Sequence, residues 1–309
     1  MDTQLAQLNF AMNLETPLLR LPWLKNTYLK FEGGGIFYNH KFRSASYLLA
    51  HAIRSGRNIK KIADRSSGSW AMGLAWAAKQ VGAASTFVSV NPPPTYVSRF
   101  VKALGGDFKI VNDNEERLRH LEILQANGFW IPDQHRNPRV IRAFDKTLGC
   151  QLARQLESQN IKPDILIGPI GTGGLIAGTG KHLRRRYSSL KTIGVDRSTS
   201  IVHSCGEHRS QSLTPVRGVG SEDEICITFV RARKYIDEIR AICPSRIHME
   251  SQNFASFFPA SIGASTALAL AAARENEGKL AANQVQIVLG PDRGETYESI
   301  LSLDPGREE

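Results

Sequence analysis

The sequence predicts an α/β protein made of two doubly wound αβ domains. Short apolar stretches of strand length alternate with longer helical patterns along most of the 309 residues, as in parallel sheets covered by helices on both faces. Glycine- or serine-rich loops join several strands to the following helices. The alternation is interrupted near residue 140. We therefore expect a smaller domain over residues 34–140, and a larger one built from residues 1–33 and 141–309.

The predicted elements follow in chain order from periodicity and from breaker residues. Alternating or continuously apolar runs predict strands at residues 16–21, 28–32, 59–63, 85–90, 108–111, 129–131, 164–167, 191–195 and 286–289. Apolar residues at helical spacing predict helices at residues 44–55, 70–81, 95–104, 114–126, 140–157, 175–185, 231–241 and 262–275. In such a fold, ligands bind where the carboxyl ends of strands meet helix N-termini.

Composition indicates a globular protein. Hydrophobic residues make up 41% and charged residues 22% of the chain, which excludes a disordered class. The longest apolar run is too short to span a bilayer, and the N-terminus does not resemble a signal peptide, so we expect a cytoplasmic protein without membrane contact. The net charge of +10 lies in small groups without interleaved aromatics. This pattern argues against nucleic-acid binding and suits an anionic substrate.

The cysteines do not form a pattern typical of metal or disulfide sites. Cys150, Cys205, Cys226 and Cys243 are widely spaced, without a CxxC pair, which favours free thiols in a reducing compartment. Two histidines flank Cys205, but that stretch is interpreted as a surface loop, and no metal site is expected.

Lys41 is the candidate nucleophile. It lies a few residues after Gly33-Gly34-Gly35, where glycines permit a tight turn. A lysine held in a cleft loses proton affinity and can attack a carbonyl carbon. Taken alone, a lysine near glycines is more often an ordinary solvated residue.

Two further loops have the composition of anion sites. Gly171-Thr172-Gly173-Gly174 connects a buried strand to a helix, so backbone N–H groups could bind a phosphate there, although an ordinary glycine turn is the alternative. Ser66-Ser67-Gly68-Ser69 precedes another helix and could bind a carboxylate, with plain N-capping as the alternative. Gln134 could donate its amide to the same carboxylate.

Taken in order, these motifs resemble the cysteine synthase and cystathionine β-synthase family of pyridoxal-phosphate enzymes (fold type II). Its motifs correspond here to residues 16–21, 39–43, 66–71, 134–138, 171–175, 218–220 and 291–297. The resemblance implies pyridoxal 5'-phosphate in the cleft between the two domains, small amino-acid substrates and a homodimer. It gives Lys41 as the catalytic residue that bonds the cofactor aldehyde.

The resemblance also assigns the other site residues. It places Ser69, Gly171, Thr172, Gly173, Gly174 and Leu175 at the cofactor, with Ser261 or Arg293 beside its pyridine nitrogen. It places Ser66, Ser67, Gly68, Gln134, Arg217 and Gly218 at the substrate. The implied reaction is a transferase β-replacement on O-acetylserine or O-phosphoserine, through an aminoacrylate, with addition of an amine or thiol.

Four departures from the family pattern argue against plain sulfide addition: Phe42, Ser69 with Trp70, Leu175 and Arg293. The terminus around Arg293 resembles the siderophore-pathway branch that makes N-(2-amino-2-carboxyethyl)-L-glutamate, a precursor of diaminopropionate. Arg217 and Arg293 would then suit an anionic leaving group. Three alternatives stay open: a cysteine synthase proper, an eliminating lyase or deaminase in which Trp70 fills the acceptor space, and a non-catalytic protein-binding relative.

Overall fold

The computed structural model describes residues 2–198, 200, 202, 216, 218–220 and 225–294. These residues form two compact units, one of residues 1–14 and 41–139 and the other of residues 15–40 and 140–309. Each is an α/β unit with its own sheet, which confirms the predicted fold class. No helix in the described part of the chain is long and apolar enough to cross a membrane.

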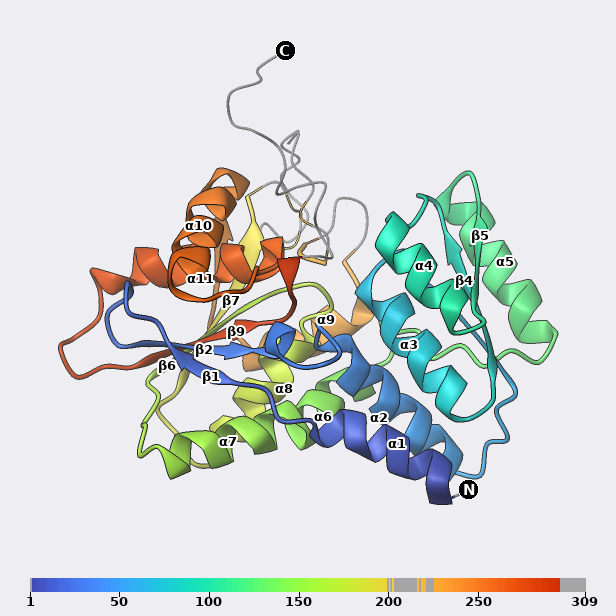
Figure 1. Ribbon diagram of the computed structural model, residues 1–309, viewed down its shortest axis with the longest axis horizontal. Coiled ribbons are helices and arrows are strands. Elements are labelled where there is room, and N and C mark those ends of the chain that lie inside the picture. Colours follow the sequence, from blue (N-terminus) through green and yellow to red (C-terminus); the bar gives the residue numbers. More distant parts are fainter. Residues whose placement is uncertain are drawn as a thin grey trace, which may run out of the picture. The chain divides into compact units, whose positions relative to one another are not determined.

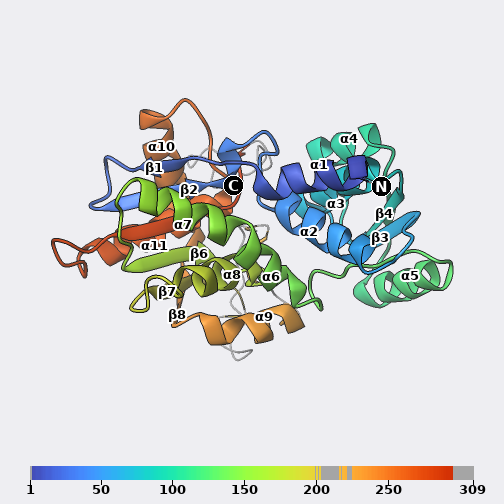
Figure 2. The ribbon, with the colours of Figure 1, turned by 90° about the horizontal axis from the view of Figure 1, so that it is seen from below.

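The first unit is built on the parallel sheet β3-β4-β5, formed by Lys61–Arg65, Ala84–Ser89 and Asp107–Ile110. Helices α3 (Ser69–Gln80) and α4 (Thr95–Ala103) lie on one side of this sheet, and α5 (Asn114–Ala126) lies on the other (Figures 1 and 2). Helix α2 (Lys41–Arg54) packs on α3, and α1 (Asp2–Asn13) packs on α2. Each βαβ connection therefore carries a loop at the carboxyl end of a strand.

The second unit contains a six-stranded sheet in the order β1-β2-β9-β6-β7-β8. All neighbours are parallel except the edge pair β1–β2. The strands are Leu18–Arg20, Thr27–Phe31, Gln286–Gly290, Ile165–Pro169, Lys191–Arg197 and Glu238–Ile242. Their inward-facing side chains join a large apolar core, in which Leu29, Ile167 and Val288 are fully buried.

Helices cover both faces of this sheet. In Figure 1, α10 and α11 lie above the sheet, and α7 and α8 lie below it. The helices of this unit are α6 (Arg139–Lys146), α7 (Leu148–Ser158), α8 (Gly174–Leu183), α9 (Ile227–Ala232), α10 (Ile247–Phe257) and α11 (Ala264–Glu277). Because β2, β9 and β6 run parallel, the loops after Phe31, Gly290 and Pro169 emerge at the same edge of the sheet.

Two segments join different units from those expected. Residues 1–14 belong with residues 41–139, because α1 packs on α2 and the Arg43 guanidinium donates hydrogen bonds to the carbonyls of Met12 and Leu14. Residues 34–40 belong with the second unit. There Asn39 forms an antiparallel bridge with Asp292.

Three predicted elements were wrong. The helix expected at residues 231–241 is instead the end of α9, a 3-10 turn and the edge strand β8. The helix expected at residues 140–157 is two helices, separated at Thr147, whose φ and ψ are −115° and −86°. The strand expected at residues 129–131 makes only an isolated bridge, between Trp130 and Ile62.

Candidate active site

Lys41 is the first residue of α2 and is held from both its backbone and its side chain. The Ser44 hydroxyl donates to the Lys41 carbonyl at 3.1 Å. A side chain at Gly73 would come within 2.9 Å of the Lys41 carbonyl carbon, so α3 packs directly on this turn of α2. The partly buried Lys41 Nζ donates to Gln134 Oε1 at 2.9 Å. The first unit thus joins two predicted site residues far apart in sequence.

A second buried lysine, Lys30, has a different role. It is fully buried in β2, and its Nζ donates to the Thr16 carbonyl, to Gln151 Oε1 and to Gln155 Oε1 at 2.5–2.7 Å. These acceptors hold the ammonium group in the interior of the second unit, where it stabilises the packing of β2. Lys41, by contrast, is only partly buried and lies at the N-terminus of α2 beside the Gln134 amide.

The serine loop, Ser66-Ser67-Gly68-Ser69, leads into α3, the helix that packs on Lys41 in the same unit. Ser66 Oγ accepts hydrogen bonds from the Gly68 and Ala71 N–H groups, both at 3.2 Å, so this hydroxyl caps the start of α3. Ser67, Gly68 and Ser69 are partly exposed. A Cβ built on Gly68 would meet nothing within 4 Å, which leaves open space over the loop for a small anion.

An ion pair joins the serine loop to the Gln134 loop. Arg65, which precedes Ser66, lies 3.5 Å from the carboxylate of Asp133, which precedes Gln134. Asp133 Oδ1 also accepts from the His135 and Arg136 N–H groups at 3.1 and 3.2 Å, and its φ is +41°. The ion pair therefore fixes the two predicted carboxylate-binding segments against each other.

Two titratable groups next to these loops, the buried Asp64 and the partly buried His135, have strongly shifted pKa values. Burial and the Asp133 charge raise the pKa of Asp64 to about 7, although its carboxylate accepts from Trp70 Nε1 at 2.8 Å. Burial lowers the pKa of His135 to about 3, assisted by the positive charges of Arg65, Lys41, Arg117 and Arg136. His135 is thus neutral at physiological pH and lies in a strongly positive environment.

The glycine loop of the second unit, Gly171-Thr172-Gly173-Gly174, is closely packed and needs glycine at three positions. Gly173 has φ +73°, which favours glycine. A Cβ at Gly171 would lie 2.5 Å from the Gly218 carbonyl oxygen, and one at Gly174 would lie 2.5 Å from Val140 Cγ1. Thr172 is 6% exposed, and Leu175 is buried in the first turn of α8. The Gly174 N–H donates to Thr172 Oγ1 at 3.4 Å. The start of a helix is a common place for a phosphate to bind.

The loop after β9 brings together Ser261 and Arg293, the two candidates for the pyridine nitrogen. A Cβ at Gly294 would lie 2.6 Å from Ser261 Oγ. The Arg293 guanidinium lies 4.7 Å from the centre of the Tyr38 ring. The buried Asp292, which precedes Arg293, accepts from Ser265 Oγ at 2.7 Å. Arg217 lies outside the described residues, as does the histidine-flanked Cys205.

The predicted site residues thus fall into two groups. Lys41, Gln134 and the serine loop belong to the first unit, whereas the glycine loop with Gly218, Ser261 and Arg293 belongs to the second. Sequence reasoning missed Asp64, Arg65, Asp133 and His135. The sequence signal that could have identified them is their position: Asp64 and Arg65 directly precede the serine loop, and Asp133 and His135 flank Gln134.

These residues fit the two reactive ends of one pyridoxal phosphate. The first unit offers the Lys41 amine for its aldehyde, and the second offers the glycine-rich start of α8 for its phosphate. A family model described as pyridoxal-phosphate dependent enzyme matches residues 11–292. The chain therefore belongs to the pyridoxal-phosphate-dependent enzymes, and more narrowly resembles those of fold type II. Pyridoxal 5'-phosphate is its cofactor, as the sequence predicted.

Known relatives agree with this assignment. A cysteine synthase of Staphylococcus aureus is 27% identical over 202 residues, which cover 61% of this chain and 63% of that enzyme. The S. aureus catabolic L-threonine dehydratase TdcB is 31% identical over 188 residues, or 58% of this chain and 53% of that enzyme. The match thus spans less than two thirds of each relative. The crystal structure of O-ureido-L-serine synthase superposes with a TM-score of 0.85 and 20% identity, covering 100% of this chain and 98% of that one.

Proposed function

We propose that the protein is a transferase of the cysteine synthase type that carries out β-replacement on an O-activated serine. The observation that carries the proposal is the 2.9 Å hydrogen bond from Lys41 Nζ to Gln134 Oε1. The serine loop belongs to the same unit. This unit unites an amine for the cofactor aldehyde with an amide and N–H groups for the substrate carboxylate. The cysteine synthase and O-ureido-L-serine synthase relatives support the same class of reaction.

Each residue has a proposed part in this reaction. When bound, the cofactor supplies an electron sink for the substrate α-carbon. Lys41 Nζ holds the cofactor and takes the α-proton as general base. The Ser67 hydroxyl and the Gln134 amide orient the substrate carboxylate, next to Gly68, whose N–H is bonded to Ser66 Oγ. Gly171–Gly174 bind the cofactor phosphate, with Leu175 packed beneath them, and Gly218 shapes the same loop. Ser69 and one of Ser261 and Arg293 contact the cofactor ring.

The donor is proposed to carry an anionic leaving group, as O-phosphoserine does. The cations around His135, namely Lys41, Arg65, Arg117 and Arg136, make the serine-loop side of the first unit attractive to anions. Arg217 and Arg293 are further candidates for binding the anionic leaving group. We propose that the acceptor is an amine, as in the branch that makes N-(2-amino-2-carboxyethyl)-L-glutamate for siderophore synthesis. We also propose that the protein works as a homodimer in the cytoplasm.

Elimination is the second candidate, supported by the dehydratase relative. Trp70 was expected to favour elimination by filling the acceptor space. The structure does not support this, because the indole is 2% exposed and donates to the buried Asp64. A substrate screen separates the two reactions: O-phosphoserine, O-acetylserine and serine are each supplied with sulfide, glutamate or no acceptor. We expect O-phosphoserine to be consumed fastest, with a new amine or thiol adduct. Pyruvate and ammonia formed at an equal rate with and without acceptors would identify a lyase.

Lys41→Ala tests the cofactor linkage. After borohydride reduction of the wild-type holoenzyme, we expect the peptide that contains Lys41 to carry the mass of the reduced cofactor. The variant should show no labelled peptide and should lose the visible absorbance of the bound cofactor. Lys30→Met serves as the control, since Lys30 is bonded inside the second unit. Label on Lys30, or a wild-type protein without label at Lys41, would overturn the assignment.

A further inference from the structure

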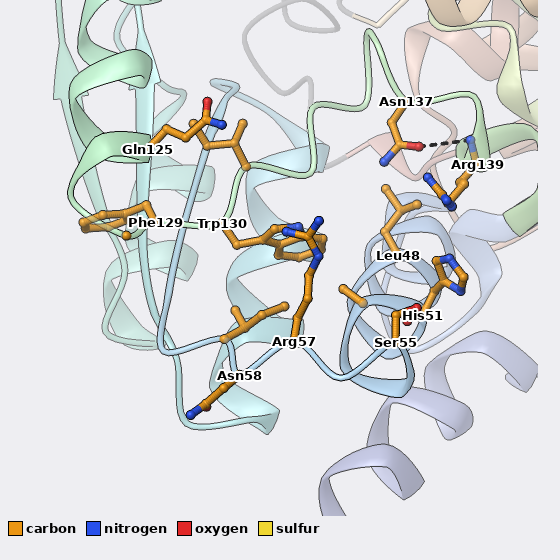
Figure 3. A pocket seen from close by; sticks show the side chains of 14 residues that line it. Leu48, His51, Ser55, Arg57, Asn58, Gln125, Phe129, Trp130, Asn137 and Arg139 are labelled. Carbon is orange, nitrogen blue, oxygen red and sulfur yellow. Dashed lines mark hydrogen bonds between the residues drawn. The ribbon is translucent and has the colours of Figure 1, made fainter.

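The first unit contains a pocket of about 690 Å³ that the proposed reaction does not use. One wall is the second half of α2, with Leu48, His51 and Ala52, and Ser55 directly after the helix. The other is the segment from Gln125 to Arg139, which includes Phe129 and Trp130. Figure 3 shows Trp130 in the centre of the view, with the α2 side chains on one side and Gln125 and Phe129 on the other.

The charges of the lining select anions. Arg57, Arg139 and His51 line the pocket, and none of the 14 lining residues is acidic. Arg57 and Arg139 are exposed, and no ion pair joins either guanidinium to a carboxylate among the described residues. Guanidinium groups bind carboxylates and phosphates through paired hydrogen bonds. Asn58 and Gln125 add amide donors to the same lining.

The shape and polarity of the remaining wall favour a flat ring. Trp130 and Ile59 contribute aromatic and aliphatic surface, and Trp130 is only partly buried. The Lys61 ammonium lies 5.4 Å from the centre of the Phe129 ring and covers one face of it. Aromatic faces bind planar groups by offset stacking. A volume of about 690 Å³ is within the range of small-molecule sites.

The two walls lead directly to the candidate active site. Helix α2 begins at Lys41 and reaches the pocket at Leu48. Gln134 does not line the pocket but lies in the same segment, between the lining residues Ile131 and Asn137. The Asn137 Nδ2 donates to the Pro132 carbonyl at 3.0 Å. An occupant would therefore touch both segments that form the Lys41–Gln134 hydrogen bond.

We propose that this pocket binds a small organic anion that carries a flat ring, and that its occupancy changes the Lys41–Gln134 pair and hence substrate affinity. The binding part of this proposal is independent of the reaction assigned above, and the kinetic part depends on it. Titration calorimetry of the holoenzyme tests binding with AMP, which has both features, against adenosine without the anion and inorganic phosphate without the ring.

AMP is expected to bind with a dissociation constant below about 1 mM, and adenosine and phosphate at least tenfold more weakly, since each lacks one set of contacts. Arg57→Ala and Arg139→Ala should weaken AMP binding at least tenfold. Arg99→Ala, an exposed arginine of the same unit that does not line the pocket, should leave it unchanged. The absence of AMP binding, or equal affinity in all the arginine variants, would overturn the site.

Coupling is measured separately by steady-state kinetics. Saturating AMP should change KM for the amino-acid donor at least twofold in the wild-type enzyme, with no change in Arg57→Ala. Binding that depends on Arg57 but leaves KM and kcat unaltered would overturn the coupling. An enzyme that consumes none of the tested donors contradicts the proposed reaction and leaves the calorimetric result standing.

Discussion

Asp64 and His135 make opposite contributions to the pH dependence of stability. The folded-state pKa of Asp64 is raised to about 7, so its contribution is fully present below the unfolded pKa of about 4 and is lost as pH rises to 7. The folded-state pKa of His135 is lowered to about 3. Its contribution is present above the unfolded pKa of about 6.5 and is lost as pH falls. Between about pH 4 and 6.5 the two slopes oppose each other.

A variant that lacks one of these two groups should therefore show the pH dependence of stability that the other group causes. Asp64→Asn is expected to gain unfolding free energy, relative to the wild type, as pH rises from 4.5 to 6.5, by up to about 1.4 kcal/mol for each pH unit. His135→Gln should show the reverse, a relative loss with rising pH. Urea unfolding at half-unit pH steps measures both differences. Parallel pH profiles in the wild type and both variants would show that neither group titrates as its burial requires.

At the scale of elements, the close contact between α6 and α8 depends on Gly178. A Cβ there would lie 2.3 Å from the Ile141 carbonyl oxygen and 2.7 Å from Phe144 Cβ. Because the clash involves backbone, rotamer changes cannot relieve it, and Gly178→Ala should lower the unfolding free energy by about 1–3 kcal/mol. This distortion would reach the glycine loop, which precedes α8, so weaker cofactor binding is also expected.

Gly278→Ala is the matched control. Gly278 follows α11 with φ −64°, and a Cβ there would meet nothing within 4 Å. Alanine at this position should leave stability unchanged or raise it by up to about 1 kcal/mol, because it restricts the unfolded chain. Chemical denaturation of the holoenzyme and the cofactor-free protein compares the two variants. Equal stability of both would mean that α6 and α8 tolerate separation.

Local sequence patterns predicted the elements whose apolar period survives in the folded protein. Strands such as β6 and β9 are continuously buried, and their sequences are apolar except for Gln286 at the start of β9. Strand β8 was missed because Glu238 and Arg240 are good helix formers, whereas pairing with β7 at the sheet edge decides their conformation. The helices α1 and α10 were also missed.

The candidate site shows the same division. Lys41, Gln134 and the glycine loop could be found because each lies in a short motif with a local physical reason. The Arg65–Asp133 ion pair could not, because it depends on which loops the parallel sheet brings together. The Asp64–Trp70 hydrogen bond is local, but it depends on both side chains being turned into the core. Burial then sets the pKa values of Asp64 and His135, and no pattern of neighbouring residues encodes that burial.

At the scale of the whole molecule, the net charge of +10 should act on the rate of substrate capture. A positive protein attracts a donor with net negative charge, and salt screens this attraction over a Debye length of about 10 Å at 0.1 M. We expect kcat/KM for O-phosphoserine to fall several-fold as NaCl is raised from about 20 to 300 mM, because screening removes the long-range attraction.

O-acetylserine, a zwitterion without net charge, is the matched control and should change much less. Added chloride competes with the carboxylate of both donors alike, so the difference between them isolates the leaving-group charge. Parallel decreases for the two donors would contradict an electrostatic preference for the anionic one, and would shift the proposed donor towards O-acetylserine.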